Sequence, residues 1–472
     1  MTPAWRGYAL GVCAVSSAVV LALEILAARV LAPVLGSGTT VWAALLAAAL
    51  GSLAVGNLLG GMLVLRWTPQ AIVAWALCLG ATVMAAAAWL HRPLIQACAG
   101  ASLTSGSLLS AVVLEGPPML LLGVITPALI AAGDEKRRGL WAGWVLSVGS
   151  AGGIVGALAA GVWLIPALGL ARTFVVFSTT LALAAIPACV WPLRPAGLLV
   201  IGVAGLVGIV RWQGAVSVGV VESPYGQIEI RQDSTGKRLL VDGLPQTSLP
   251  PDEIAPGDAL RRGYLLELAL SDRQVRDALV IGLGGGLVPR ILNAHDIRWH
   301  AVELDPVIVK TAREEFALSL PPDSVTVGDG RRFLAANTAT FDLIVVDVCT
   351  ADRLPAHLFT REALTLMRAR LRPGGLLAVQ FVSDDGEFAA SLRATAGSIF
   401  PRPVIVTARD PAPVPRWLFA SAAPLPPVGP GAPFDLLPET PGGQILTDDH
   451  FAAERAWTRT AWQWRQSYAS RR

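Results

Sequence analysis

The stretch ALVIGLGGGLVPRILNAHDIRWHAVELD, residues 278–305, decides the fold of the C-terminal half of the chain. Its apolar beginning, 279–281, is bounded by a glycine and predicts a buried parallel strand. Residues 288–293 fit the first turns of a helix, with Pro289 near its N-terminus. Between them, a cluster of glycines lets the backbone turn sharply and approach a ligand closely: Gly282, Gly284, Gly285 and Gly286.

A second strand is predicted at 299–304, with the acids Glu303 and Asp305 at its end. An acid at the tip of the second strand of such a unit is placed to hydrogen-bond a ribose hydroxyl. For the glycines alone, the alternative is a tight turn between strand and helix that binds nothing. The acid on the second strand, together with acids further along the chain, favours a nucleotide-type site.

Two further predicted strands carry acids at their carboxyl ends. The segment SVTVGDGRRFL, 324–334, contains a strand followed by Asp329, and FDLIVVDV, 341–348, is a buried strand followed by Asp347. In a doubly wound α/β sheet, ligands bind outside the carboxyl ends of the strands, so both acids belong to the same edge as Glu303. For Asp347 the alternative is a helix N-cap.

A small β layer precedes this α/β region. The segments ESPYGQIEIRQD, 222–233, and KRLLVDGLPQTS, 237–248, alternate apolar and polar residues, and an Asp-Gly pair favours a hairpin. A proline-rich link follows at 250–256. We therefore expect a small β-hairpin domain over 217–257 and an α/β domain over 258–472.

The N-terminal half has a different composition. The chain is 53% hydrophobic, with a mean hydropathy of +0.56, which is too apolar for one soluble protein. No acid lies between Glu24 and Glu115 or between Glu135 and Glu222. Apolar blocks of at least about 18 residues are candidates for transmembrane helices. We expect a helical membrane domain over 1–212, with seven spans at 8–31, 41–65, 71–90, 107–132, 140–164, 172–191 and 196–212.

Seven spans would put the two ends of the chain on opposite faces of a membrane. Most basic residues of this half, including 136–138, then lie on the N-terminal face, and the positive-inside rule places the soluble part outside the cell. A second crossing within 94–132 would give eight spans and a cytosolic C-terminus. Because the predicted ligand is a cytosolic nucleotide-like cofactor, we expect a bacterial-type inner membrane and a cytoplasmic soluble domain.

Three features interrupt the apolar character of the membrane half. Glu24 and Arg29 share one apolar segment, where they either contact neighbouring helices and the membrane interface or line a polar path. The sequence EGPP, 115–118, predicts a broken helix or a buried loop. The glycines of GSAGGIVGALAAG, 149–161, are spaced for close helix packing.

The charges and cysteines exclude several kinds of site. Residues beyond 212 carry 27 basic and 30 acidic side chains, and this balance argues against a nucleic-acid surface. The five cysteines have neither metal nor redox spacing, and the five histidines form no ligand cluster. We therefore expect neither a metal site nor a disulfide framework.

The order of these pieces resembles the spermidine synthase family of polyamine aminopropyltransferases. The blocks SPYGQIEI, LLVDGLPQTS, VIGLGGG, VELD, VGDGRRFL, FDLIVVD and LRPGGLLAVQ match that family's blocks in order over 222–382. Membrane segments such as ALEILAARVLAPVLGSGTTVW, and LTDDH near the end, are similar to the multi-span, membrane-fused variety. The resemblance implies a Rossmann-like methyltransferase fold with a small N-terminal β-domain.

The resemblance also implies roles for individual residues. Glu303 would hold the ribose of S-adenosylmethionine or its decarboxylated form, and Asp329 would bind the adenine amino group. Gln246 would line the sulfonium and acceptor region, and Asp347 would orient or deprotonate the attacking amine. The other predicted site residues are Gly282, Gly284, Gly286 and Gly330 on the cofactor side and Tyr225 and Thr350 on the acceptor side. The implied partners are a small-molecule amine acceptor and the lipid bilayer, and a homodimer is compatible with the resemblance.

Two acidic positions of the aminopropyl-transferring members of the family are not acidic in this chain. Those members carry an aspartate in the glycine-rich turn, where this chain has Gly285. They also carry a second acid three residues after the catalytic one, where this chain has Thr350. A dicationic acceptor needs carboxylates in its pocket, so these departures weaken the case for putrescine and for the decarboxylated donor.

Three functions therefore remain open. The first is a membrane-anchored transferase that moves an aminopropyl group onto an amine. The second keeps the cofactor but transfers a methyl or other group to a substrate delivered by the membrane domain. The third is a transporter or sensor whose soluble domain binds a nucleoside ligand, and a polar path through Glu24, Arg29 and Glu115 would favour it.

Overall fold

The chain divides into two compact units, which we describe separately because their placement relative to each other is not determined. The first unit comprises Met1–Gly226 and the second Gln227–Arg472. In this computed structural model, the described residues are 2–98, 102–190, 219–233, 236–250, 266, 270, 274–348, 354–382, 386–408, 415–423, 434–438, 442–451, 462–463 and 465–466.

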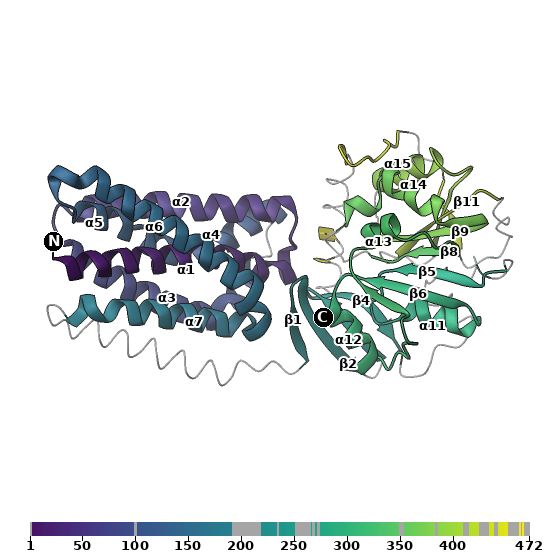
Figure 1. Cartoon of the computed structure of the whole chain (residues 1–472), viewed down its shortest axis with the longest axis horizontal. Coiled ribbons are helices and arrows are strands. Elements are labelled where there is room, and N and C mark those ends of the chain that lie inside the picture. Colours follow the sequence, from purple (N-terminus) through teal and green to yellow (C-terminus); the bar gives the residue numbers. More distant parts are fainter. Residues whose placement is uncertain are drawn as a thin grey trace. The chain divides into compact units, whose positions relative to one another are not determined.

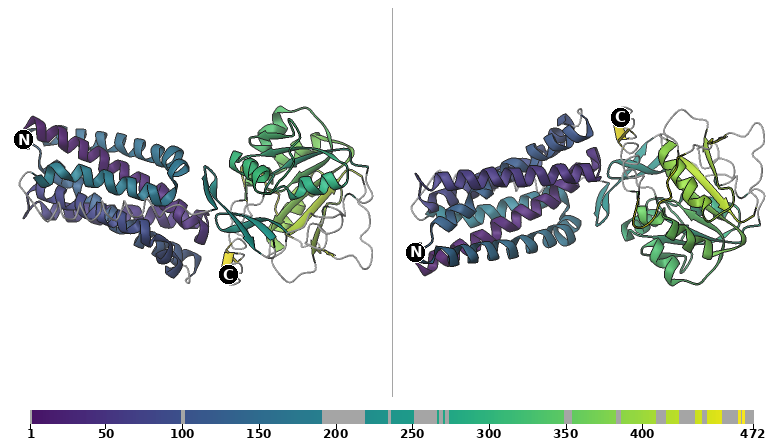
Figure 2. Two further views of the ribbon diagram at one scale, coloured as in Figure 1. Left: turned by 90° about the horizontal axis from the view of Figure 1, so that it is seen from below. Right: turned by 90° about the horizontal axis from the view of Figure 1, so that it is seen from above.

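The first unit is a bundle of long helices that lie side by side (Figures 1 and 2). Helix α1 begins after Thr2, whose side-chain oxygen accepts a hydrogen bond from the Trp5 N–H, and ends at Leu35, before Gly36, which has φ 86°. Helix α4 packs against α1, α2 and α3. The helices are α1 (Pro3–Leu35), α2 (Thr39–Leu63), α3 (Pro69–Cys98), α4 (Leu103–Gly123), α5 (Ile125–Ala131), α6 (Arg138–Leu158) and α7 (Ile165–Val190), with η1 (Glu135–Arg137) before α6, a π-helical turn η2 (Ala159–Leu164) after it, and strand β1 (Val220–Ser223) following later.

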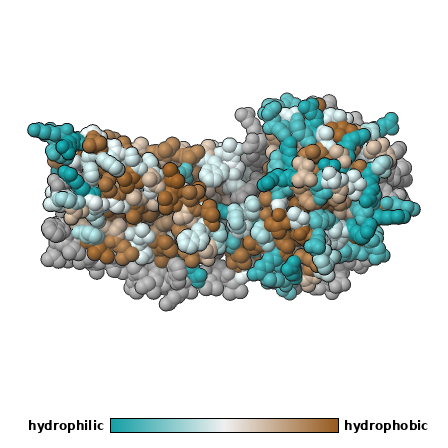
Figure 3. Space-filling view, viewed as in Figure 1, coloured by the Kyte–Doolittle hydropathy of each residue, from teal (hydrophilic) through white to brown (hydrophobic). Residues whose placement is uncertain are grey.

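The surface of this bundle is itself apolar. Figure 3 shows hydrophobic residues gathered over the helices, and Leu50, Leu58, Val162 and Trp163 are among the large apolar side chains that point outward. A contiguous apolar surface of this kind belongs against lipid or another apolar partner, because exposure to water would be costly.

Five helical segments among the described residues are long and apolar enough to cross a membrane: Pro3–Leu35, Thr39–Leu63, Pro69–His91, Leu103–Ala131 and Glu135–Cys189. The last has 55 residues and is interrupted at Gly169, which has φ 77° and ψ 172°. Six of the seven predicted spans overlap these segments, and the seventh, 196–212, lies outside the described residues. Among the described residues of 94–132 there is one candidate span, Leu103–Ala131, and the predicted second crossing in this region stays a prediction.

The break predicted at 115–118 is wrong, because α4 runs as a helix through Pro117 and Pro118. Each proline removes one backbone hydrogen bond from the helix. Dense packing around this turn keeps the helix intact: Glu115, Gly116 and Pro118 are all buried, and a Cβ on Gly116 would lie 3.2 Å from the Ser52 Oγ of α2. Packing against neighbouring helices therefore overrides the local tendency to break.

The glycines of 149–161 bring α6 into backbone contact with α1. A Cβ on Gly152 would overlap the Ala14 carbonyl, and one on Gly156 would overlap the Ala18 carbonyl. Small residues at this spacing let two helices approach closely enough for backbone-to-backbone packing.

The second unit contains a small antiparallel meander and a large mixed sheet (Figure 1). Strands β2 (Gly226–Asp233), β3 (Gly236–Val241) and β4 (Leu244–Leu249) pair in sequence order, with Asp242 and Gly243 both at positive φ in the turn. The large sheet has the order β12-β10-β11-β9-β8-β5-β6-β7. Its strands are β5 (Asp277–Ile281), β6 (Arg298–Glu303), β7 (Val325–Val327), β8 (Phe341–Val346), β9 (Leu371–Val382), β10 (Val404–Ala408), β11 (Pro415–Ser421) and β12 (Phe434–Leu436).

Strands β5 to β9 are parallel to one another, and β10 to β12 add an antiparallel edge. The order confirms the predicted Rossmann-like, doubly wound fold. Helices α11 (Leu287–Ala294), α12 (Pro306–Glu314), α13 (Gly330–Ala336), α14 (Arg361–Ala369) and α15 (Gly386–Gly397), with the short turn η3 (Ala356–Leu358), connect the strands.

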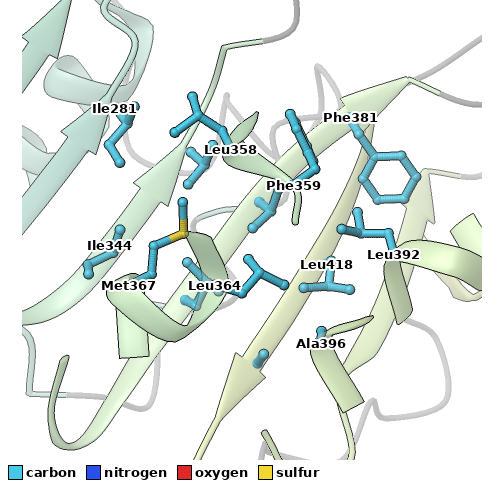
Figure 4. Close-up of a cluster of buried hydrophobic side chains, with 14 of the residues drawn as sticks. Ile281, Ile344, Leu358, Phe359, Leu364, Met367, Phe381, Leu392, Ala396 and Leu418 are labelled. Atoms are coloured by element: carbon cyan, nitrogen blue, oxygen red, sulfur yellow. The ribbon is translucent and has the colours of Figure 1, made fainter. Parts of the chain in front are cut away.

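Apolar side chains from both faces of the large sheet form its core. On the face drawn in Figure 4, Ile344 of β8 lies beside Met367 of α14, and Ile281 of β5 and Leu364 of α14 belong to the same cluster. Near-continuous apolar runs in β5 and β8 are buried on both faces, as expected of central parallel strands.

We predict that Gly156→Leu destabilises the helical unit. A leucine there collides with the backbone of α1, and overpacking of this kind costs about 1–3 kcal/mol. The purified full chain should therefore melt at a lower temperature. Gly143→Leu in the same helix is the matched control, because a Cβ on Gly143 has no neighbour within 4 Å. Equal melting temperatures for the two variants would contradict the close packing of α6 on α1.

Candidate active site at the carboxyl edge of the parallel strands

The strand order brings four predicted site segments to one edge of the sheet. Strand β5 lies between β6 and β8, so the chain leaves β5 at the point where the strand order changes direction. The loops after β5, β6, β7 and β8 all leave the carboxyl ends of parallel strands. Ligands of doubly wound sheets bind at this switch point.

The glycine-rich loop after β5 has a backbone that other residues rarely adopt. Gly282, Gly284 and Gly286 have φ of 93°, 54° and 84°. A Cβ on Gly282 would also overlap the backbone carbonyl of Asp347, whose N–H donates to the Ile281 carbonyl at 2.9 Å. The loop and Asp347 are therefore neighbours through their backbones.

The carboxylate of Glu303 holds this loop. Its Oε2 accepts a hydrogen bond from the Leu283 N–H at 2.8 Å, and its Oε1 accepts one from the Asp305 N–H at 2.9 Å. The side chain is buried, and burial raises the pKa of Glu303, an effect that the N–H donors of Asp305 and Leu283 oppose. Each carboxylate oxygen has a second lone pair, so Glu303 can still accept a hydrogen bond from a ribose hydroxyl.

Asp329 caps helix α13 at the end of β7. Its Oδ1 accepts a hydrogen bond from the Arg332 N–H at 2.9 Å, and its Oδ2 lies 2.8 Å from the His357 Nε2. Burial alone would raise the pKa of Asp329, but the Arg332 N–H and His357 together hold it below its usual range. The carboxylate is thus kept ionised and able to accept a hydrogen bond, which is what an adenine amino group requires.

Next to Asp329, a polar cluster joins distant parts of the chain. The Arg331 guanidinium donates to the Asp448 Oδ1 at 2.6 Å and to the His357 carbonyl at 3.1 Å. Asp448 also accepts from the Thr360 hydroxyl at 2.8 Å. Asp448 belongs to the LTDDH block. The block can be recognised in the sequence, but no local sequence pattern shows that Asp448 pairs with Arg331.

Thr247, rather than Gln246, contacts the glycine-rich loop. The Thr247 Oγ1 accepts a hydrogen bond from the Gly285 N–H at 2.8 Å, and a Cβ on Gly285 would lie 2.8 Å from the Thr247 Cγ2. The Gln246 amide lies 3.5 Å from the Leu244 carbonyl. Gln246 is the predicted site residue, and Thr247 follows it in the chain. Only the register of β4 shows that Thr247, and not Gln246, faces the loop.

The remaining predicted residues fall in different places. Gly330 opens α13, where a Cβ would collide with the Ile281 side chain, so this glycine serves helix packing. The Asp347 side chain is half-buried at the end of β8. Tyr225 belongs to the first unit and is 42% exposed. Thr350 lies outside the described residues.

Comparison with known proteins finds one matching family and several similar proteins. Residues 264–388 match the family described as the Spermine/spermidine synthase domain. The Polyamine aminopropyltransferase 2 of Pseudomonas aeruginosa is 32% identical over 199 residues, which are 39% of this chain and 55% of that protein. The N-terminal histidine N-methyltransferase of Emericella nidulans is 37% identical over 133 residues, 26% of this chain and 23% of that protein.

A solved structure shares this region as well. The probable spermidine synthase of Corynebacterium glutamicum is 20% identical, covers 50% of this chain and 98% of its own, and superposes with a TM-score of 0.43. The chain spans between 23% and 55% of the length of the two curated relatives. The match to the family described as the Spermine/spermidine synthase domain therefore covers residues 264–388 of the C-terminal half.

Proposed function

We propose that the protein is a transferase that alkylates an amine with an adenosyl sulfonium donor, and that its helical unit anchors it in a membrane. The donor is S-adenosylmethionine or its decarboxylated form. One observation carries the proposal: a buried carboxylate, Glu303, holds a glycine-rich loop directly beside Asp347 at the switch point of the sheet. The matched family over 264–388 and the named aminopropyltransferase relative support this activity.

In the proposed mechanism, Glu303 binds the ribose, Asp329 the adenine amino group, and Gln246 lies on the sulfonium side. The lone pair of the acceptor amine attacks a carbon bonded to sulfur, the C–S bond breaks, and a neutral thioether leaves. The amine loses one proton, which Asp347 accepts. A carboxylate near the sulfonium also attracts the cationic donor and the ammonium that forms during the reaction.

A second candidate function, methyl transfer, is favoured by the geometry at Gly285. Aminopropyl-transferring members carry an aspartate at this position, but here Thr247 fills the space that its Cβ would need. A donor that keeps its carboxylate has less need of an acid in this turn. The named N-methyltransferase relative is consistent with this alternative.

The membrane anchor and its orientation are part of the proposal. Five candidate spans in the first unit support membrane attachment. A cytoplasmic C-terminal unit agrees with a nucleoside cofactor made in the cytosol. The acceptor would be a small amine or a substrate that reaches the enzyme at the membrane surface.

We predict that Glu303→Gln weakens donor binding. The amide cannot accept hydrogen bonds from both N–H groups, and a buried donor left unpaired costs about 1–3 kcal/mol. Calorimetry with each donor form should show an affinity at least about tenfold lower. Glu314→Gln is the control, because that side chain is exposed at the end of α12. Unchanged affinity in Glu303→Gln would place the donor elsewhere.

We predict that Asp347→Asn abolishes most turnover while donor affinity changes little. General acid–base groups contribute about 10²–10⁴-fold, so kcat should fall by at least about 10²-fold. Asp296→Asn is the control, because Asp296 is exposed and its φ of 55° is readily adopted by asparagine. Steady-state kinetics should also show putrescine to be a poor acceptor. Full activity of Asp347→Asn would remove its catalytic role, and efficient spermidine formation would show that acids outside the turn bind the diamine.

We predict that the aspartate of Gly285→Asp fits only when the side chain at position 247 is smaller than threonine. Alone, the aspartate collides with the threonine methyl group and lowers the melting temperature. Combined with Thr247→Ala, it should fit and raise the preference for the decarboxylated donor by about tenfold, through a charged hydrogen bond to the donor's amine. Competition between the two donors measures the preference. No change in preference in the double variant would show that this position does not select the donor.

A further inference from the structure

Helix α4 carries one acid in the interior of the helical unit. Glu115 is 0% exposed, and neither of its carboxylate oxygens has a hydrogen-bond partner among the described residues. Its neighbours one turn away on the same face of α4, Ala111 and Met119, are buried and apolar. The proposed transferase does not use this residue.

An ionised carboxylate in such a place is very costly unless a positive charge accompanies it. Two arrangements avoid the cost: the carboxyl group keeps a proton, or a cation binds next to it. The second arrangement makes Glu115 a binding site rather than a structural residue.

A second acid lies on a helix that packs against α4. Glu24 belongs to α1, which contacts α4, and its side chain is half-buried. Arg29 of the same helix donates instead to the backbone carbonyls of Ser223, at 3.0 Å, and Pro224. Both carboxylate oxygens of Glu115 lack a hydrogen-bond partner among the described residues. A buried, unpartnered acid, with a second acid on a helix packed against its own, attracts a cation from outside the chain.

The surroundings fit an organic cation better than a metal ion. Calcium takes about six to eight oxygen ligands, and magnesium keeps a shell of water that an apolar interior cannot supply. The described residues contain no group of three or more acidic, histidine or cysteine side chains suited to a metal. An alkylammonium group needs only a few acceptors, and its carbon chain packs well against apolar side chains.

We propose that Glu115 and Glu24 form a binding site for an alkylammonium cation inside the helical unit. Glu115 accepts hydrogen bonds from the ammonium group, and Glu24 adds a second negative charge. The site goes beyond the proposed transferase and does not depend on it, because it uses none of the residues of the C-terminal unit.

The test uses the full chain in lipid nanodiscs, in an Asp347→Asn background that removes the proposed catalytic acid. The melting temperature is titrated with propylammonium and with 1,4-diaminobutane, at fixed pH and ionic strength, with 1-propanol as the uncharged control. We expect both amines to stabilise the protein and 1-propanol to have no effect. Glu115→Gln should weaken amine binding at least about tenfold, and Glu24→Gln should weaken it in the same direction. Glu135→Gln, on the exposed turn before α6, should bind as the background does.

Several outcomes would overturn the proposal. Equal stabilisation of Glu115→Gln and the background would place the cation elsewhere. Stabilisation by sodium or potassium chloride equal to that by the amines would show a nonspecific ionic effect. No response to any amine would show that Glu115 simply keeps a proton. Glu115→Gln removes a buried acid and should still elute as a folded species on size exclusion; should it aggregate, Glu24→Gln alone decides the test.

Discussion

Two hydrogen bonds to one carboxylate support the geometry of the C-terminal unit. Glu303 ends β6, and its two oxygens accept from the N–H groups of Leu283 and Asp305. The first bond fixes the loop that follows β5, and the second fixes the start of α12, so one side chain connects two βα junctions. Because the carboxylate is buried, removing it leaves two backbone donors without partners, which is more costly than losing two exposed hydrogen bonds. The close approach between the backbones of Gly282 and Asp347 depends on this arrangement.

Much of the C-terminal unit could be predicted because its signals are local. Apolar runs beside glycines gave strand β5 and its loop, and acids after the strands gave the edge where Glu303, Asp329 and Asp347 lie. Contacts between distant residues could not be predicted. Thr247 reaches the loop across 38 residues, and only strand register decides that it, not Gln246, faces Gly285. The sequence indicates only that such residues belong to a family motif, such as LLVDGLPQTS for Thr247, and not which residue they contact.

In the helical unit, local sequence signals do not predict where the helices are interrupted. The prolines at 117 and 118 favour a break in any isolated helix, yet α4 continues through them because it is surrounded by other helices. In this unit, tertiary packing determines where the backbone can bend. The bend occurs instead at Gly169, which adopts a φ that only glycine reaches easily. Local propensity gives the length of these helices but not the position of their interruptions.

The pairing of Arg331 with Asp448 has a consequence for synthesis of the chain. The two residues are 117 positions apart, and the same cluster positions His357 against Asp329. Contacts of such separation close only after the intervening chain exists. On the ribosome, the central parallel strands can assemble early, while the contacts around Asp329 stay incomplete until residue 448 has emerged. Newly made chains would therefore complete this edge of the sheet last, after the central strands have paired.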